Sequence, residues 1–206
     1  MHKKVTSEIA NDSFGNPTND QAGYNILMRM NQEHRSVATW AFKHFKIHKD
    51  DVCLDVGCGG GANIKRMVKK AKHVTGIDIS AMAIKVSREV NQESELASKI
   101  DLQQVSIEEF AAPANTFSLI TAFSTVYFWT DYLQGFKNIY RLLANKGCFC
   151  LIITPAKKQA KWKKIPYFQV RNEFRLLKDL QNIGFNDLQL ITEPQQGFLL
   201  IKATKI

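Results

Sequence analysis

The sequence lacks any apolar stretch long enough to cross a membrane. Its longest apolar runs, such as residues 148–153, reach only strand length, whereas a membrane helix needs roughly 18 apolar residues. No apolar segment follows the basic residues at the start, so a secretory signal is not expected. The four cysteines are too few for a disulfide scaffold and show no C-x-x-C spacing. We therefore expect reduced thiols, no metal site and a cytoplasmic protein.

The composition is that of one globular unit. The chain has 206 residues, of which 45% are hydrophobic and 23% charged, far from the composition of disordered chains. The net charge of +9 indicates attraction to something anionic, which could be nucleic acid, an acidic small molecule or a membrane surface. Charge alone does not choose among these partners.

The N-terminal quarter differs from the remainder of the chain. Residues 1–20 are polar and rich in turn-forming residues, and apolar residues then recur at helical spacing up to about residue 47. We expect residues 1–46 to form an arm and one or two lid helices, in front of a domain spanning residues 47–206.

Strand and helix patterns alternate along that domain. Such alternation is typical of a doubly wound α/β fold with a mostly parallel sheet, and the last two strands form a hairpin that adds an antiparallel end. The expected strands are 52–56, 74–78, 101–105, 117–123, 148–154, 188–192 and 198–204, and the expected helices are about 61–72, 80–92, 131–144 and 171–182.

A glycine cluster follows the first strand, where an open α/β sheet binds its ligands. Asp78 ends the second strand, 21 residues after Gly57, and a carboxylate there can accept hydrogen bonds from a ribose. The ligand is therefore expected to contain a nucleoside. Gly57-x-Gly59-x-x-Ala62 fits the dinucleotide pattern, in which a pyrophosphate lies on a helix N-terminus.

A second pattern includes the acid before the glycines. D-x-G-x-G-x-G, formed by Asp55, Gly57, Gly59 and Gly61, resembles the motif of class I S-adenosylmethionine-dependent methyltransferases, and the resemblance continues at residues 76–80, 117–122 and 140–147. It covers roughly residues 47–204 and implies a seven-stranded sheet of order 3-2-1-4-5-7-6. The cofactor-binding residues that it implies are Asp55, Gly57, Cys58, Gly59, Gly61, Asp78, Ile79, Ser106, Ile107 and Phe123. Many relatives carry Asp near Ser106, so either the Ser106 hydroxyl or Glu108 would meet the adenine.

Charge also favours the methyltransferase over a nicotinamide enzyme. An acid at Asp55 would repel a pyrophosphate but suit a cofactor carrying an ammonium and a sulfonium. None of the five tyrosines has a lysine four residues later, as the single-domain reductases would require.

The acceptor side is expected after the fourth strand, at residues 123–130. Ser124, Tyr127 and Trp129, with Tyr24 of the lid, are the predicted acceptor residues, although the aromatic side chains could instead simply pack under the next helix. A general base is needed only for an acceptor that arrives protonated, and Tyr127 and His34 are the candidates.

The expected activity is methyl transfer from S-adenosylmethionine to a small-molecule acceptor. Base methylation is disfavoured because the chain has neither a [DN]-P-P-[YF] motif after the fourth strand nor a Pro-Cys pair. An RNA or protein methyltransferase and a non-catalytic nucleoside-binding regulatory domain are the alternatives. The basic segment 157–164 could contact RNA or attract an acidic substrate, or it could be a solvated loop. No membrane partner is expected, and the sequence assigns no oligomeric state.

Overall fold

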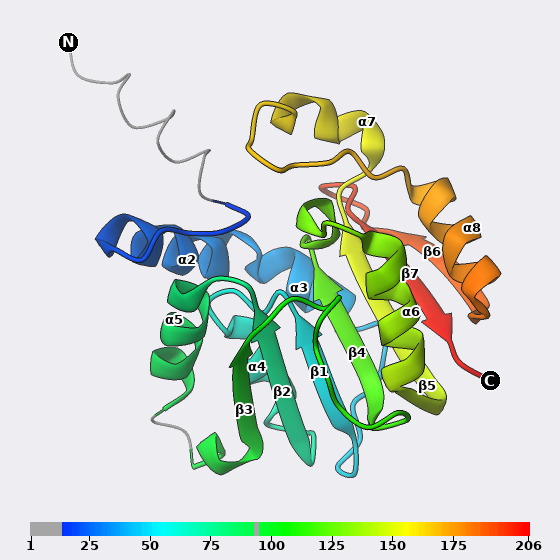
Figure 1. Ribbon diagram of the computed structural model, residues 1–206, viewed down its shortest axis with the longest axis horizontal. Helices are drawn as coiled ribbons and strands as arrows, with labels where there is room; N and C mark the ends of the chain where they lie inside the picture. The colour runs from blue at the N-terminus through cyan, green and yellow to red at the C-terminus, as the bar shows by residue number, and fades with distance from the viewer. Residues whose placement is uncertain (1–13, 93–94) are drawn as a thin grey trace.

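A seven-stranded sheet runs through the middle of the molecule in the order β3-β2-β1-β4-β5-β7-β6 (Figure 1). The computed structural model describes residues 14–92 and 95–206. β7 is antiparallel to both β5 and β6, and the other pairs are parallel. The predicted fold class and strand order are confirmed. The strands are β1 (Val52–Val56), β2 (His73–Asp78), β3 (Ile100–Gln104), β4 (Phe117–Phe123), β5 (Leu143–Ile153), β6 (Asn186–Thr192) and β7 (Leu199–Thr204).

The helices mostly match the expected positions. α4 ends at Met67, earlier than predicted, and the basic segment after β5 contains two short helices that the sequence did not predict. The expected N-terminal arm lies partly outside the described residues, and the boundary at residue 47 stays a prediction. The helices are α2 (Gln21–Glu33), α3 (Arg35–Ala41), α4 (Ala62–Met67), α5 (Ala81–Asn91), α6 (Tyr132–Leu142), α7 (Ala156–Gln159) and α8 (Glu173–Ile183), with single 3-10 turns η1 (Ala97–Lys99), η2 (Val126–Phe128) and η3 (Ala160–Trp162).

Helices cover both faces of the sheet. α6 and α8 pack on one face, where Phe136 and Leu180 are fully buried against strand residues such as Phe149. α3 and α4 pack on the other face, with Val37 and Met67 in its core. Burial of these side chains on two faces supplies the main stabilisation of the fold.

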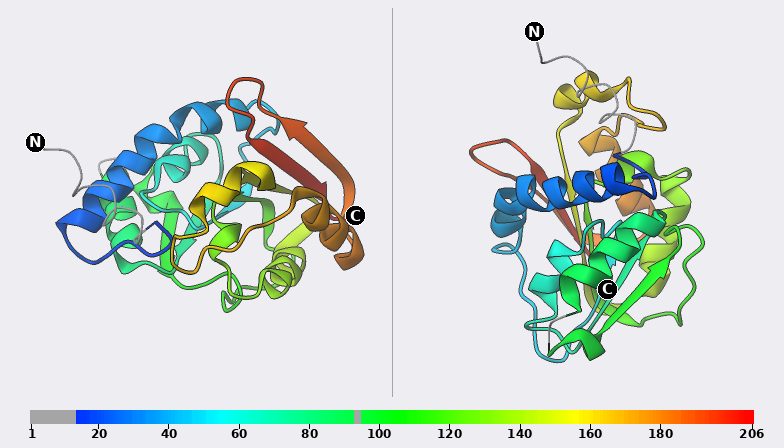
Figure 2. Two further views of the ribbon diagram at one scale, coloured as in Figure 1. Left: turned by 90° about the horizontal axis from the view of Figure 1, so that it is seen from above. Right: turned by 90° about the vertical axis from the view of Figure 1, so that its left-hand side faces the viewer.

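α2 and α7 lie at the end of the sheet toward which the parallel strands point, and the views of Figure 2 place both at this end. Asp20 caps α2 by accepting from the N–H of Gly23 at 2.9 Å. Leu27 of α2 is buried against Met82, Ala83 and Val86 of α5. α2 is thereby held across the carboxyl ends of the strands.

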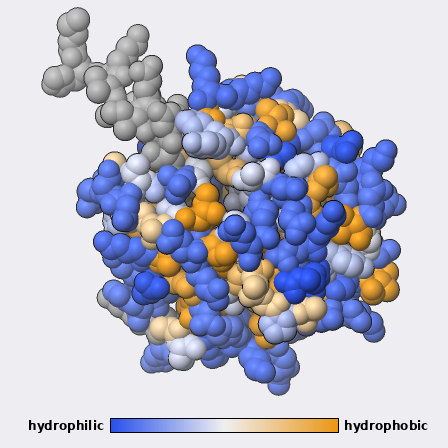
Figure 3. Space-filling view, in the orientation of Figure 1, coloured by the Kyte–Doolittle hydropathy of each residue, from blue (hydrophilic) through white to orange (hydrophobic). Residues whose placement is uncertain are grey.

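One face of the molecule is predominantly polar. Hydrophilic residues cover most of the face seen in Figure 3, and hydrophobic ones occur in small separate areas. Among the helices that the structure describes, none combines the length and apolar character needed to span a bilayer.

Candidate functional site

A cavity of about 400 Å³ opens at the carboxyl ends of the parallel strands. Its floor is the loop after β1 and the ends of β2 and β4. Its walls come from α2, from the segment after β4, from the segment after β5 and from the β6–β7 hairpin. In an open α/β sheet this is the expected place for a ligand, because the connections diverge there.

The glycine loop brings backbone atoms directly to the cavity. Gly57 and Gly59 have φ of 67° and 51°, a left-handed conformation that other residues adopt only at a cost. A Cβ at Gly57 would clash with the Thr125 side chain, so this glycine permits close contact between the loops after β1 and β4. A Cβ at Gly59 would meet only Leu27, at 3.9 Å, and would otherwise project into open space.

Asp78 stands at the end of β2, on the cavity wall. Its Oδ2 accepts from the N–H of Gly59 at 3.0 Å, and its Oδ1 accepts from the N–H of Ser80 at 2.9 Å. Burial raises the pKa of the Asp78 carboxyl, while these backbone N–H groups oppose the shift. Each carboxylate oxygen can accept a further hydrogen bond from a ligand hydroxyl.

Most residues predicted to bind the cofactor border the cavity. Ser106 lies on the wall, whereas the Glu108 carboxylate accepts from the N–H of Asp131 at 3.2 Å. The structure thus favours Ser106 over Glu108 at this position. The predicted residues that line the cavity are Gly57, Gly59, Asp78, Ile79, Ser106, Ile107 and Phe123.

Three predicted residues lie behind the glycine loop, outside the cavity lining. Gly61 is the N-cap of α4 and packs against Ser87, and Cys58 is buried near Gly76. Burial raises the pKa of the Cys58 thiol well above its usual value, so the thiol stays protonated. The third residue is Asp55, which is 1% exposed.

Asp55 is not among the residues that line the cavity, and its side chain binds a neighbouring strand. Its Oδ1 accepts from the Thr121 hydroxyl at 2.7 Å. Burial raises the pKa of the Asp55 carboxyl to about 7, although the Thr121 hydrogen bond opposes the shift. The expected attraction between Asp55 and a ligand ammonium stays a prediction.

Comparison with known proteins agrees with the sheet and its glycine loop. Residues 54–151 match a family model described as a methyltransferase domain. An uncharacterized methyltransferase of Bacillus subtilis, YdaC, is 28% identical over 164 residues, which cover 78% of this chain and 86% of that protein. These comparisons support a class I S-adenosylmethionine-dependent methyltransferase family for the chain.

Two further similarities concern one curated enzyme and one solved structure. The ubiquinone biosynthesis O-methyltransferase of Actinobacillus pleuropneumoniae is 36% identical over 99 residues, or 46% of this chain but only 42% of that enzyme. The crystal structure of a methyltransferase from Aquifex aeolicus superimposes with a TM-score of 0.74 at 17% identity, covering 89% of this chain and 98% of the other. The similarity to the solved structure concerns the fold.

Among the predicted acceptor residues, Ser124, Tyr127 and Trp129 line the cavity. Ser124 has φ of 55°, a conformation rare outside glycine that often marks functional sites. The predicted Tyr24 does not reach the cavity, because its side chain packs where α2 meets α5. The Tyr127 hydroxyl accepts from the N–H of Thr154, and burial raises the pKa of this phenol, so it stays protonated.

His34 also lines the cavity, at the junction between α2 and α3. Burial lowers the pKa of its imidazole, and the neighbouring Glu33 opposes that shift. Within residues 14–92 and 95–206, no hydrogen-bond partner of the ring is found. A neutral imidazole with a free nitrogen can accept a proton from a bound molecule.

The largest contribution that sequence reasoning missed is the roof segment, residues 156–171. Trp162, Ile165 and Phe168 line the cavity from it, and Phe168 packs on Tyr127 with ring centroids 5.0 Å apart. The three-residue spacing of these apolar side chains was the available signal. It was hidden by the lysines between them, which made the segment resemble a solvated loop.

Two buried side chains fix the ends of the roof segment. The Gln159 amide donates to the carbonyls of Thr154 at 2.6 Å and Arg171 at 2.9 Å, and its oxygen accepts from the N–H of Arg171 at 2.8 Å. Arg171 in turn donates to the carbonyls of Val126 at 3.2 Å and Trp129 at 3.0 Å. The roof segment and the segment after β4 are therefore joined into one wall.

Proposed function

We propose that this protein transfers a methyl group from S-adenosylmethionine to a small, largely apolar acceptor that carries an ionisable hydroxyl. The observation that carries the proposal is the cavity, which joins the glycine loop and Asp78 to a wall of aromatic side chains. One site could thus hold a nucleoside-containing cofactor and a flat acceptor side by side. Holding two reactants in line is the main contribution of a protein to such a transfer.

The residues present fit the cofactor. Asp78 would accept from the ribose hydroxyls, and the open space beside Gly59 leaves room for a ligand against the backbone. Ile79, Ser106 and Ile107 offer apolar surface and one hydroxyl for a flat base. S-adenosylmethionine, when bound, supplies a methyl group already activated by its sulfonium.

The chemistry of the acceptor follows from the wall opposite the glycine loop. Tyr127, Trp129 and Phe168 line it together with Phe128 and Trp162, so water is largely excluded and an aromatic acceptor finds stacking partners. Ser124 and the Tyr127 hydroxyl offer polar contacts. The name of the Actinobacillus relative, a ubiquinone biosynthesis O-methyltransferase, is consistent with a phenolic acceptor here.

His34 would remove the acceptor proton. The pKa of its imidazole is held below the usual value by burial, so the ring is neutral at pH 7 and free to accept the proton of a phenolic hydroxyl. Tyr127, whose phenol stays protonated, is better suited to orient the acceptor by donating a hydrogen bond.

Calorimetric titration with S-adenosylmethionine, S-adenosylhomocysteine and NADH tests the cofactor. We expect binding of the first two without NADH, and at least about tenfold weaker binding of both to Asp78→Asn. Asp101→Asn, an exposed acid on β3, is the matched control. Binding of NADH alone would refute the proposal, and binding of the cofactor without turnover of any phenol or quinol would favour a regulatory domain.

A further inference from the structure

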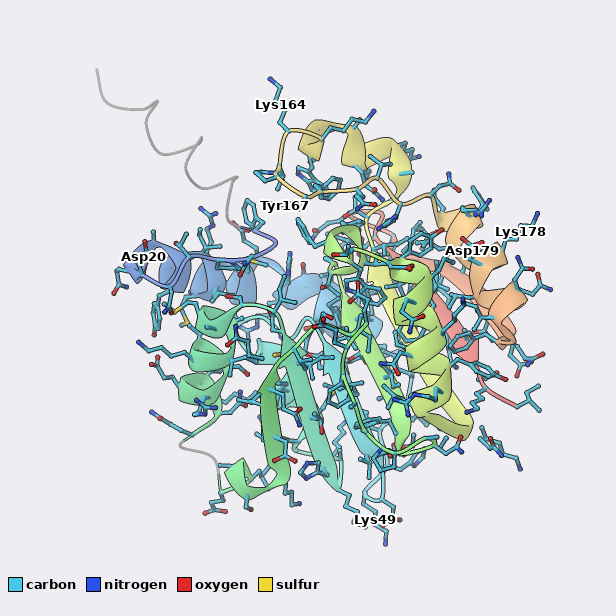
Figure 4. All side chains as sticks on the ribbon, viewed as in Figure 1. Asp20, Lys49, Lys164, Tyr167, Lys178 and Asp179 are labelled. Atoms are coloured by element: carbon cyan, nitrogen blue, oxygen red, sulfur yellow. The ribbon has the colours of Figure 1, made fainter. Side chains whose placement is uncertain are left out.

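The roof segment has an outer surface as well as a cavity-facing one. Trp162, Ile165 and Phe168 line the cavity, whereas Lys161, just before them, and Lys163 and Lys164, between Trp162 and Ile165, are exposed. Figure 4 shows Lys164 extending from the end of the molecule opposite Lys49. The roof segment contains no aspartate or glutamate, and none occurs anywhere between Asp131 and Glu173. The roof segment itself is thus basic, and acids meet it from outside the segment: Glu173 accepts from the N–H of Ala156 at 3.0 Å, and Glu193 lies near Lys158.

Apolar side chains accompany these lysines on the outside. Tyr167 is 88% exposed, Val170 41% and Phe174, in the first turn of α8, 67%. Tyr167 also has φ of 62°, an unusual conformation for a bulky residue. Large apolar side chains exposed this fully beside a functional cavity indicate a surface that meets a partner.

We propose that Lys161, Lys163, Lys164, Tyr167, Val170 and Phe174 form a docking surface for an anionic lipid bilayer. Stable attachment at a membrane surface takes two signals, apolar insertion and attraction to anionic lipid. The lysines supply the attraction, and Val170 and Phe174 supply side chains that enter the acyl boundary. Tyr167 suits the headgroup level, where amphipathic rings concentrate.

The chemistry favours a bilayer over RNA as the occupant. Lysines beside aromatic rings would serve either partner, but Val170 offers an aliphatic group that has no role in base stacking. The docking surface is moreover the outer side of the wall that closes the apolar cavity. A docked protein would hold the roof of the cavity at the membrane surface, where apolar acceptors are concentrated; this step alone rests on the proposed function. The sequence had led us to expect no membrane partner, and surface docking, which needs no spanning helix, revises that expectation.

Vesicle flotation tests the docking surface without knowledge of the acceptor. With vesicles of phosphatidylglycerol and phosphatidylcholine at about 3:7 in about 0.1 M salt, we expect binding that is lost on pure phosphatidylcholine and weakened at about 0.5 M salt. Lys161→Gln, Lys163→Gln and Lys164→Gln together should reduce partitioning by about tenfold or more. The matched control replaces three exposed lysines at the starts of strands, each by glutamine. Lys49 lies three residues before β1, and Lys72 and Lys99 directly precede β2 and β3.

The apolar contribution is tested separately. Tyr167→Ser combined with Phe174→Ser should lower partitioning by about tenfold, whereas Ile206→Ser, at a residue 73% exposed near the other end of the sheet, should leave it unchanged. No binding of the wild-type protein to charged vesicles would overturn the proposal. Equal losses in the two lysine triples, or binding of a single-stranded RNA without binding of vesicles, would overturn it as well. Cofactor titration of the same variants is independent, so failure of the docking surface and failure of the proposed function are distinguishable.

Discussion

The backbone N–H of Gly59 donates a 3.0 Å hydrogen bond to the Asp78 carboxylate, which joins the loop after β1 to the end of β2. The bond fixes the glycine loop and the carboxylate as one unit before any ligand arrives. Such preorganisation lowers the cost of binding. It also means that changes at Gly59 affect Asp78.

Gly59→Val should weaken binding of S-adenosylmethionine by about tenfold or more, because the new side chain enters the space beside the loop and strains its positive φ. Calorimetry measures the affinity. Gly184→Val is the control, since Gly184 also has positive φ but ends α8, remote from the cavity. An unchanged affinity in Gly59→Val would remove the loop from the site.

His34→Gln should lower turnover by about 100-fold with cofactor affinity intact, because the acceptor loses its proton-accepting group. In the wild type, the rate should rise with pH through the imidazole pKa, which burial holds below its usual value, and then level off. NMR titration of the ring and initial rates on a panel of phenols check both statements. His44→Gln is the control, because His44 packs on Trp40 outside the cavity lining. Full activity in His34→Gln would show that the acceptor needs no base from this residue.

Asp55 should make the protein less stable as pH rises from 5 to 8. Its pKa is about 7 when folded and near 3.9 when unfolded, so between these values the folded state binds more protons and the free energy of unfolding falls with pH. Denaturant titrations should show a decrease about 2 kcal/mol larger in the wild type than in Asp55→Asn.

Asp50→Asn, at an exposed position, is the control for Asp55→Asn and should keep the wild-type slope. A wild type and Asp55→Asn with parallel pH profiles would mean that the buried carboxyl titrates near its ordinary value.

Gln159→Leu should destabilise the protein by about 2–4 kcal/mol, because the buried carbonyl of Thr154 and both backbone groups of Arg171 lose their partner. Trypsin should then cut faster at Lys161, Lys163 and Lys164. Gln181→Leu, at an exposed position of α8, should change neither property. Equal cleavage rates in the two variants would contradict the role assigned to Gln159.

The sheet could be predicted in detail, because alternating buried strands and helices leave a clear pattern. β1 and β4 have the predicted bounds, and Gly59 and Asp78 meet as their spacing implied. The hydrogen bond between Asp55 and Thr121 could not be predicted, since the motif gives the position of Asp55 in the chain but not its partner on β4. β5 begins at Leu143, earlier than predicted, because the pairing of Leu143 with Phe117 depends on a register shift that local sequence does not reveal.

The roof segment was missed for a different reason. It packs against residues distant in sequence. Phe168 packs on Tyr127, and the backbone N–H of Gln169 donates to the Tyr127 carbonyl at 2.9 Å. Local composition alone describes a basic loop. Only the packing against the segment after β4 turns Trp162 and Phe168 into part of the cavity.

Gln159 and Arg171 hold the two ends of the loop between them by hydrogen bonds, so this loop can be exchanged as a unit. A foreign loop grafted between these residues would meet the same hydrogen-bonded ends while presenting different side chains to the acceptor. The glycine loop, on the opposite side of the cavity, would keep its sequence and its hydrogen bond to Asp78. Under the proposed function, exchange of this loop alone would change the acceptor contacts and leave the cofactor contacts of the glycine loop in place.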